Sequence, residues 1–226
     1  MEKIDWEEQW GGAKSEEVYA YTATRQYSGN VNISQEFLYL HAKKAMEDLR
    51  ERILREGWKI TECPGAVCAL KVPGTNTIYL ASSIKGPGRV PGTAGSILGI
   101  DDHVVNALRR CRIRYGGGER RHHYQGKCAE VMVTHLWFSE NPTIEDLPKS
   151  GKLIVTVNRK GEVKLPCNFY WGSGCSDWGC KQFLLEVGFT DDEVTATLGP
   201  SWEPNIHGWP RSRRGRALRR VGHRGS

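Results

Sequence analysis

Apolar side chains recur at helical spacing between residues 34 and 55. The apolar positions are Phe37, Leu38, Leu40, Ala42, Ala45, Met46, Leu49, Ile53 and Leu54. This spacing predicts an amphipathic helix with one buried face. Ser34 is a suitable N-cap residue, and Gly57 follows the last apolar position as a helix terminator.

The apolar pattern changes after residue 58. Residues 66–72 and 77–83 are short runs of strand-forming residues, separated by Pro73-Gly74-Thr75-Asn76. This arrangement predicts a β-hairpin. Residues 153–157 predict a further strand, and residues 194–198 predict a last one.

Three more stretches predict helices. Asp101 or Asp102 can cap a helix that runs to about residue 112. Residues 127–138 are apolar on several sides, which predicts a buried helix that ends before Asn141-Pro142. A third helix is predicted from Cys180 to residue 187, closed by Gly188. We expect residues 1–30 to be loosely structured, because they show no lasting period.

Composition limits the class of protein. The 226 residues contain no apolar run of about 18 residues, and no basic segment followed by an apolar one stands at the N-terminus. We therefore expect no membrane association; the compartment stays unknown, with an intracellular setting favoured. The odd number of cysteines, seven, fits a fully paired disulfide framework poorly and favours metal binding or catalysis.

The positive charge lies at the C-terminal end. Residues 201–226 contain seven arginines and one acid, so they carry the whole net charge of +6. Such a segment predicts a disordered tail that can bind nucleic-acid phosphates, although basic ends without a dedicated ligand are also common.

The helix at residues 127–138 carries groups that a buried helix does not need. Cys128 stands on its first turn, where the thiol pKa is lowered, and Glu130 follows two residues later. A partly buried carboxylate is costly unless it has a function. Downstream, Pro166-Cys167 follows a predicted strand, and Cys180 opens a helix.

This order of motifs resembles the zinc-dependent deaminase superfamily of cytidine and nucleic-acid deaminases, and most closely the deaminase domains of bacterial toxins and their fungal relatives. The family pattern is a His or Cys, any residue and Glu, followed by Pro-Cys-x-x-Cys. The resemblance covers residues 60–198. It implies an α/β fold: a three-layer-like sandwich with a central mixed sheet of about five strands and helices on its faces.

The resemblance also divides the chain. Residues 1–58 are expected to form an N-terminal extension with one long helix, residues 59–199 the deaminase-like domain, and residues 200–226 the arginine-rich tail. The helices that begin at Cys128 and Cys180 would pack on one face of the sheet. The helix from residue 34 would cover an edge or the second face.

A Zn²⁺ cofactor and its ligands follow from the same resemblance. Cys128 would be the first ligand, Cys180 the second, and Glu130 the carboxylate that carries protons. The spacing departs from the family pattern, so either Cys167 or Cys175 would be the third ligand. If all four thiols bound the metal, the site would be closed and structural.

Other residues near these motifs are candidates for substrate binding. They are Ser82, Ser83, His123, Tyr170, Trp171 and Trp178. The aromatic rings among them could stack on a base, although such rings often only pack. His122 and His123 stand in a basic loop and could touch a phosphate.

The resemblance implies hydrolytic deamination of a nucleobase, cytosine by preference. The family branch and the arginine-rich tail favour a base within DNA or RNA, single- or double-stranded. Two alternatives stay open. One is a deaminase of a free nucleoside or nucleotide, and the other is a non-catalytic, zinc-stabilised binding module. A partner such as an immunity protein is not identifiable from the sequence.

Overall fold

The computed structural model describes most of the chain between residues 20 and 195. The described residues are 20–29, 31–57, 59–84, 102–116, 122, 124, 126–144, 146–167 and 178–195. The strands are β1 (Thr22–Gln26), β2 (Ala66–Lys71), β3 (Thr77–Ser82) and β4 (Leu153–Asn158). The helices are α1 (Gln35–Arg55), α2 (Asp102–Gly116), α3 (Ala129–Glu140), α4 (Cys180–Glu186) and α5 (Asp191–Thr195).

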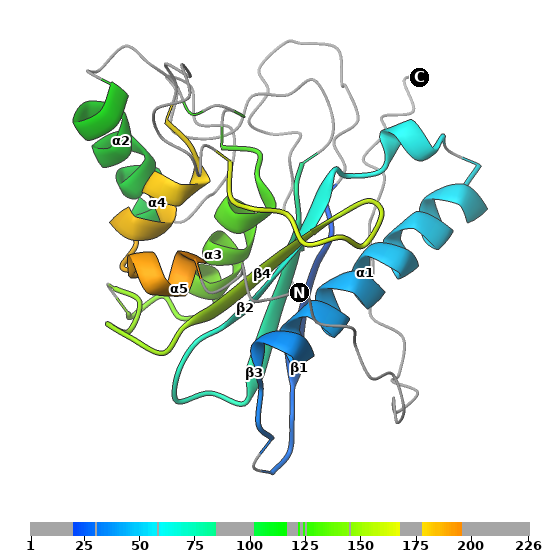
Figure 1. Cartoon of the computed structure of the whole chain (residues 1–226), viewed down its shortest axis with the longest axis horizontal. Helices are drawn as coiled ribbons and strands as arrows, with labels where there is room; N and C mark the ends of the chain where they lie inside the picture. Colours follow the sequence, from blue (N-terminus) through cyan, green and yellow to red (C-terminus); the bar gives the residue numbers. More distant parts are fainter. Residues whose placement is uncertain are drawn as a thin grey trace, which may run out of the picture.

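The four strands form one sheet in the order β1-β3-β2-β4 (Figure 1). Every neighbouring pair is antiparallel. Strand β2 lies inside the sheet, and its Cys68 is paired in register with Thr156 of β4. This register sets which β4 side chains face the same side of the sheet as Cys68.

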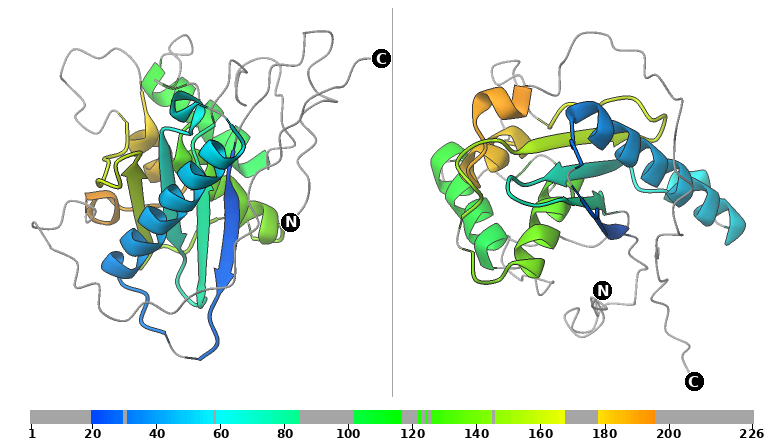
Figure 2. Two further views of the ribbon diagram at one scale, coloured as in Figure 1. Left: turned by 90° about the vertical axis from the view of Figure 1, so that its right-hand side faces the viewer. Right: turned by 90° about the horizontal axis from the view of Figure 1, so that it is seen from below.

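Alternate residues of each strand serve two separate cores. In β2, Cys68 and Leu70 belong to the core beneath α2, α3 and α4, whereas Val67 and Ala69 belong to the core beneath α1. This alternation is the period-two pattern of a sheet that is covered on both faces. Figure 2 shows α1 on one side of the sheet and α2, α3 and α4 on the other. The molecule is therefore a mixed α/β structure with helices on both faces.

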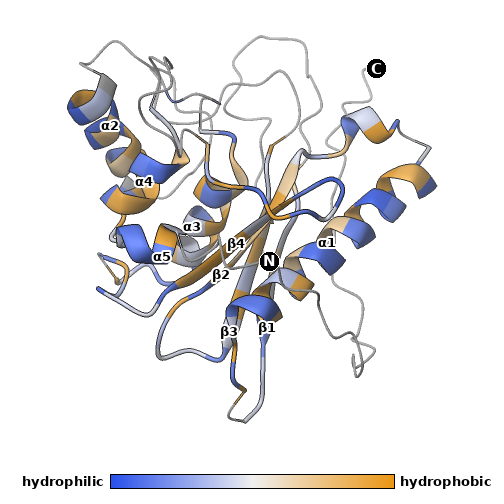
Figure 3. Cartoon of the chain, in the orientation of Figure 1, coloured by the Kyte–Doolittle hydropathy of each residue, from blue (hydrophilic) through white to orange (hydrophobic). Residues whose placement is uncertain are grey.

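Helix α1 has the predicted position and cap. The Ser34 side chain accepts a hydrogen bond from the Phe37 backbone N–H, as an N-cap should. The buried residues of the helix recur on one face, and they are Leu38, His41, Ala42, Ala45, Met46, Leu49 and Ile53. Most of the remaining positions are polar, and α1 shows both polar and apolar patches in Figure 3. Gly57 follows with a positive φ of 79°, which a glycine adopts without strain.

Helix α3 lies between the sheet and the other helices of its layer. Nine of its residues are buried, from Ala129 to Phe138, in line with the apolar character of the sequence. The cap at the C-terminal end is Asn141, immediately before Pro142. In the described ranges, no helix is both long and apolar enough to cross a lipid bilayer.

The structure corrects three expectations. Residues 22–26, expected to be loosely structured, form the edge strand β1. Val194 and Thr195, expected in a last strand, belong to helix α5. In the described part of the chain the sheet has four antiparallel strands, not a mixed set of about five. Residues 1–19 and the arginine-rich tail lie outside the described residues.

A buried histidine on α1 makes the stability of the fold dependent on pH. His41 Nδ1–H donates to the Phe37 carbonyl over 2.7 Å, and its Nε2 accepts from the Tyr27 hydroxyl. Burial lowers the pKa of His41 below its ordinary value. As the pH falls, the imidazole of His41 is therefore protonated in the unfolded chain before it is protonated in the folded one. The free energy of unfolding is thus highest above about pH 6.5 and decreases below it.

Between about pH 7.5 and about pH 5.5, the wild-type melting temperature should fall more than that of a His41→Gln variant, which has no imidazole. Calorimetry at both pH values measures the difference. Equal decreases in the two proteins would show that His41 does not carry this dependence.

Candidate metal centre

Four side chains that can bind a metal gather where α3 and α4 begin. They are His122, Cys128, Cys167 and Cys180, and their ligand atoms all lie within 4.8 Å of one another. Cys128 Sγ lies 3.7 Å from Cys167 Sγ. His122 Nε2 lies 3.4 Å from Cys180 Sγ and 3.8 Å from Cys167 Sγ. Segments that are distant in sequence thus contribute to one compact cluster.

The first thiol is positioned by the entry to α3. Cys128 is the N-cap residue of that helix. Just before it, the backbone N–H of Ile84 donates to the Lys127 carbonyl over 3.0 Å, which attaches the segment to the end of β3. Gly126 has a positive φ of 78° and allows the chain to turn into the helix.

The other two thiols are positioned together. Cys180 is the first residue of α4, and its backbone N–H donates to Cys167 Sγ over 3.1 Å. The N–H of Lys181 also reaches the Cys167 carbonyl, at 3.4 Å. The chain that leaves β4 is therefore held against the start of α4, although the two cysteines are 13 positions apart in sequence.

The cluster has the dimensions of a tetrahedral metal site. With Zn–S bonds of about 2.3 Å and Zn–N bonds of about 2.0 Å, the edges of a tetrahedron are about 3.8 Å between sulfurs and about 3.5 Å between nitrogen and sulfur. The Cys128–Cys167 sulfur separation and the separations of His122 Nε2 from the sulfurs of Cys167 and Cys180 range from 3.4 to 3.8 Å, close to these edges. Thiolates and imidazole favour zinc over magnesium or calcium. These residues could therefore hold a metal ion, and the donor set fits zinc.

Hydrogen bonds among the three thiols shift their pKa values in different directions. Hydrogen bonds from Cys128 and Cys180 hold the pKa of the Cys167 thiol far below its ordinary range. The pKa of Cys128 is raised, not lowered as its place at a helix N-terminus predicts, first because its thiol donates to Cys167. Burial raises the pKa of Cys180. A metal that bound these thiols would therefore release protons from the cluster.

Glu130 lies beside the cluster but outside the group of four. Its side chain is buried, and the Thr156 hydroxyl donates to its Oε1 over 3.0 Å. Burial raises the pKa of Glu130, and the negative charge of Cys167 raises it further. Thr156 lies opposite Cys68 in the sheet, so the carboxylate sits between the first turn of α3 and the sheet. A carboxyl group in this position can take up a proton near neutral pH more readily than an exposed one.

Comparison with known proteins identified no similar protein. Searches against protein-family models, curated proteins and solved structures found no match. Any functional conclusion therefore depends on the geometry of this site.

The structure brings together three of the four cysteines that the sequence nominates as ligands. Cys128, Cys167 and Cys180 are in the cluster, whereas Cys175 lies outside the described residues. For the fourth member, His122, the sequence indicates only a candidate phosphate contact. His122 stands six positions before Cys128. The turn at Gly126 brings the two residues together, and the sequence spacing alone does not show this.

Three of the predicted substrate-binding residues are described. The Ser82 hydroxyl accepts from the Tyr21 N–H and donates to the Ser83 carbonyl, and the Ser83 hydroxyl accepts from Gly65 and Ala66. Trp178 is buried, and its ring packs edge-on against His122 with centroids 4.9 Å apart. These groups therefore have structural contacts of their own. His123, Tyr170 and Trp171 lie outside the described residues.

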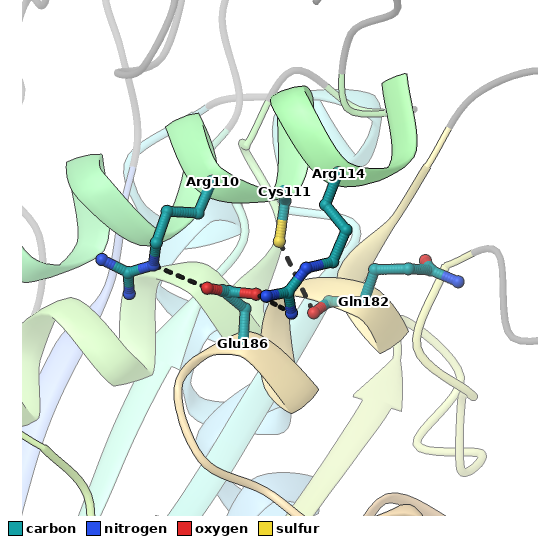
Figure 4. Close-up of polar contacts among 5 residues, drawn as sticks. All are labelled: Arg110, Cys111, Arg114, Gln182 and Glu186. Atoms are coloured by element: carbon teal, nitrogen blue, oxygen red, sulfur yellow. Dashed lines mark hydrogen bonds and ion pairs between the residues drawn. The ribbon is translucent and has the colours of Figure 1, made fainter. Parts of the chain in front are cut away.

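An ion-pair clamp holds α4 in place. Arg110 and Arg114 of α2 contact the two oxygens of Glu186 at 2.6 and 2.8 Å, and the Glu186 side chain is only 7% exposed (Figure 4). The Cys111 thiol donates to the Gln182 carbonyl over 3.5 Å in the same interface. Since α4 begins at Cys180, the clamp also helps to position one thiol of the candidate metal centre.

A Glu186→Ala variant should therefore have a lower melting temperature and weaker metal binding than the wild type. Thermal unfolding and zinc titration with a chromophoric chelator measure the two effects. Asp48→Ala is the matched control, because it removes an exposed ion pair of α1 with Lys44, and such pairs contribute little. Equal behaviour of the two variants would contradict the clamp's role.

Proposed function

We propose that this protein is a zinc-dependent hydrolytic deaminase of a nucleobase, with cytosine as the preferred base. Cys128, Cys167 and Cys180 would hold the metal, and Glu130 would carry the proton. The observation that supports this most directly is the buried Glu130 carboxyl, two residues after the N-cap thiol of α3 and bonded to Thr156.

The chemistry needs both parts of the site. Zinc held by three protein ligands would supply a Lewis acid that lowers the pKa of water to about 7. Glu130 would accept one proton from that water and pass it to the ring nitrogen of the base. It would then carry a second proton, from the added hydroxyl group, to the amino group that leaves as ammonia. Its raised pKa suits this role, because the group must hold and release a proton near neutral pH. Thr156 would orient the carboxyl through its hydroxyl.

The substrate is proposed to be a base within DNA or RNA. The seven arginines of residues 201–226 support this choice, since arginine-rich segments attract phosphates. A free nucleoside is the alternative, and it would not need such a segment.

The experiment is an assay of ammonia release by the zinc-loaded full chain. Cytidine, single-stranded DNA, duplex DNA and RNA are compared, each with and without prior chelation. We expect zinc-dependent release from a nucleic acid. Release from cytidine alone would identify a nucleoside deaminase, and no release from any of these substrates would contradict the proposed activity.

His122 favours a second candidate function, a zinc-stabilised binding module. If its Nε2 joined the three sulfurs as a ligand, the site would be closed and structural. A binding module should be indifferent to the loss of the Glu130 carboxylate, whereas an enzyme should lose turnover.

A further inference from the structure

The hydrogen bonds of His122 define which of its ring nitrogens carries the proton. The backbone N–H groups of Tyr124 and Gly126 both donate to Nδ1, each over 3.1 Å. An imidazole nitrogen that accepts hydrogen bonds has no proton of its own. In the neutral ring the proton is therefore on Nε2.

That N–H faces the sulfur atoms. Nε2 lies 3.4 Å from Cys180 Sγ and 3.8 Å from Cys167 Sγ. A protonated Nε2 can donate a hydrogen bond to a thiolate. An unprotonated Nε2 would instead direct its lone pair at the negatively charged sulfur, which is unfavourable. The arrangement is thus that of a hydrogen-bond donor to sulfur.

Histidines that ligate metals usually show the opposite pattern. They donate their second ring N–H to a carbonyl, a carboxylate or water. In His122 the second nitrogen instead receives two backbone N–H groups. Ligation through Nε2 would leave the ring with no proton on either nitrogen, or would require both of these hydrogen bonds to break.

The ring is also held in this orientation. His122 is 5% exposed, and its ring meets that of Trp178 edge-on, at an interplanar angle of 89°. The backbones of the same two residues form a parallel bridge. A rotation that presents another nitrogen to the sulfurs would disturb this packing and the turn at Gly126.

We infer that His122 is a positioning residue: its Nε2–H donates to the thiolates of Cys180 and Cys167, the three cysteines alone bind the metal, and the fourth position stays open for water. This inference rests on the proposed function, which needs an open position. The donated hydrogen bond offsets part of the negative charge that three thiolates bring to a divalent ion. The arrangement thus stabilises the thiolates without closing the site.

The test is NMR of the full chain with nitrogen-labelled histidine, loaded with the NMR-active isotope of cadmium as a probe for zinc. We expect the proton on His122 Nε2 to persist, with cadmium coupled to the β-protons of three cysteines and to no ring nitrogen. Coupling between cadmium and Nε2 would overturn the inference, because it would make His122 the fourth ligand.

Two variants give an independent measurement. In His122→Gln the side-chain amide can restore an N–H near the position of Nε2, so zinc affinity should stay close to that of the wild type. His122→Ala should weaken it by about 10- to 100-fold, as loss of an outer contact does. If His122→Gln binds zinc as poorly as Cys180→Ser, the donor role is wrong.

The two proposals fail differently. Three-cysteine coordination without ammonia release would leave the inference standing and contradict the deaminase. Ammonia release together with coupling between cadmium and His122 Nε2 would support the deaminase and contradict the inference about His122. If the protein binds neither cadmium nor zinc, both are wrong.

Discussion

Replacing Glu130 by glutamine should reduce deamination turnover by about 10²- to 10⁴-fold, the contribution of general acid–base catalysis. Glutamine has the same size and keeps an oxygen that can accept from Thr156, so the loss isolates the proton-carrying role. Zinc content should not change, because Glu130 lies outside the four-residue cluster. The melting temperature should not fall either, since burial raises the pKa of Glu130 and so makes its charge costly to the fold.

The matched control for this variant is Glu140→Gln. Glu140 is the last residue of the same helix, about 15 Å along the axis from Glu130. Its exposed carboxylate contacts Thr24 of the edge strand. Turnover and zinc content are measured for both variants, by ammonia release and by metal analysis. Unchanged turnover in Glu130→Gln, or zinc loss in that variant, would contradict the assigned role.

Helices with a strong period and clear caps could be predicted from the sequence. Helix α1 has both, and its Ser34 cap forms as expected. The β2–β3 hairpin follows from strand-forming runs on either side of Pro73-Gly74. In these elements the local sequence preferences favour the same secondary structure that the tertiary packing requires, so the sequence is sufficient to predict them.

Two elements were not predicted from the sequence. One depends on long-range strand pairing, and in the other a helix cap competes with strand propensity. Strand β1 is five residues long, and its pairing with β3 is a long-range contact. Val194 and Thr195 have strand propensity, but a capping box outweighs it. The N–H of Thr190 donates to the Glu193 carboxylate, and the N–H of Glu193 donates to the Thr190 hydroxyl. A Thr followed three residues later by Glu is a signature of a helix start that the sequence itself carries.

Some residues of the candidate site could also be predicted from the sequence, whereas others could be found only in the fold. Cysteines at the heads of two predicted helices stand out in the sequence because buried helices do not need them there. The position of Cys167 beside them depends on the fold, in which the chain that leaves β4 returns to the start of α4. His122 follows no periodic pattern, and its place in the cluster depends on the turn at Gly126 and on its packing against Trp178.

Removing the metal should lower the melting temperature by roughly 10 °C. Free zinc at a thousand times its dissociation constant stabilises the folded state by about 4 kcal/mol. In a chain of 226 residues each kcal/mol corresponds to about 2–4 °C. The effect is large because the cluster joins the starts of α3 and α4 to the segment that follows β4. Thermal unfolding with zinc and with excess chelator measures it.

Single substitutions show which thiols carry this stabilisation. Cys128→Ser, Cys167→Ser and Cys180→Ser should each abolish most of the response to zinc. Cys63→Ala is the matched control. Cys63 is a buried thiol in the core beneath α1, so its variant should lose stability but keep the zinc response. Cys175→Ser tests the alternative third ligand and should also keep it, because Cys167 supplies that sulfur. A response to zinc that survives in Cys167→Ser but not in Cys175→Ser would reverse the assignment.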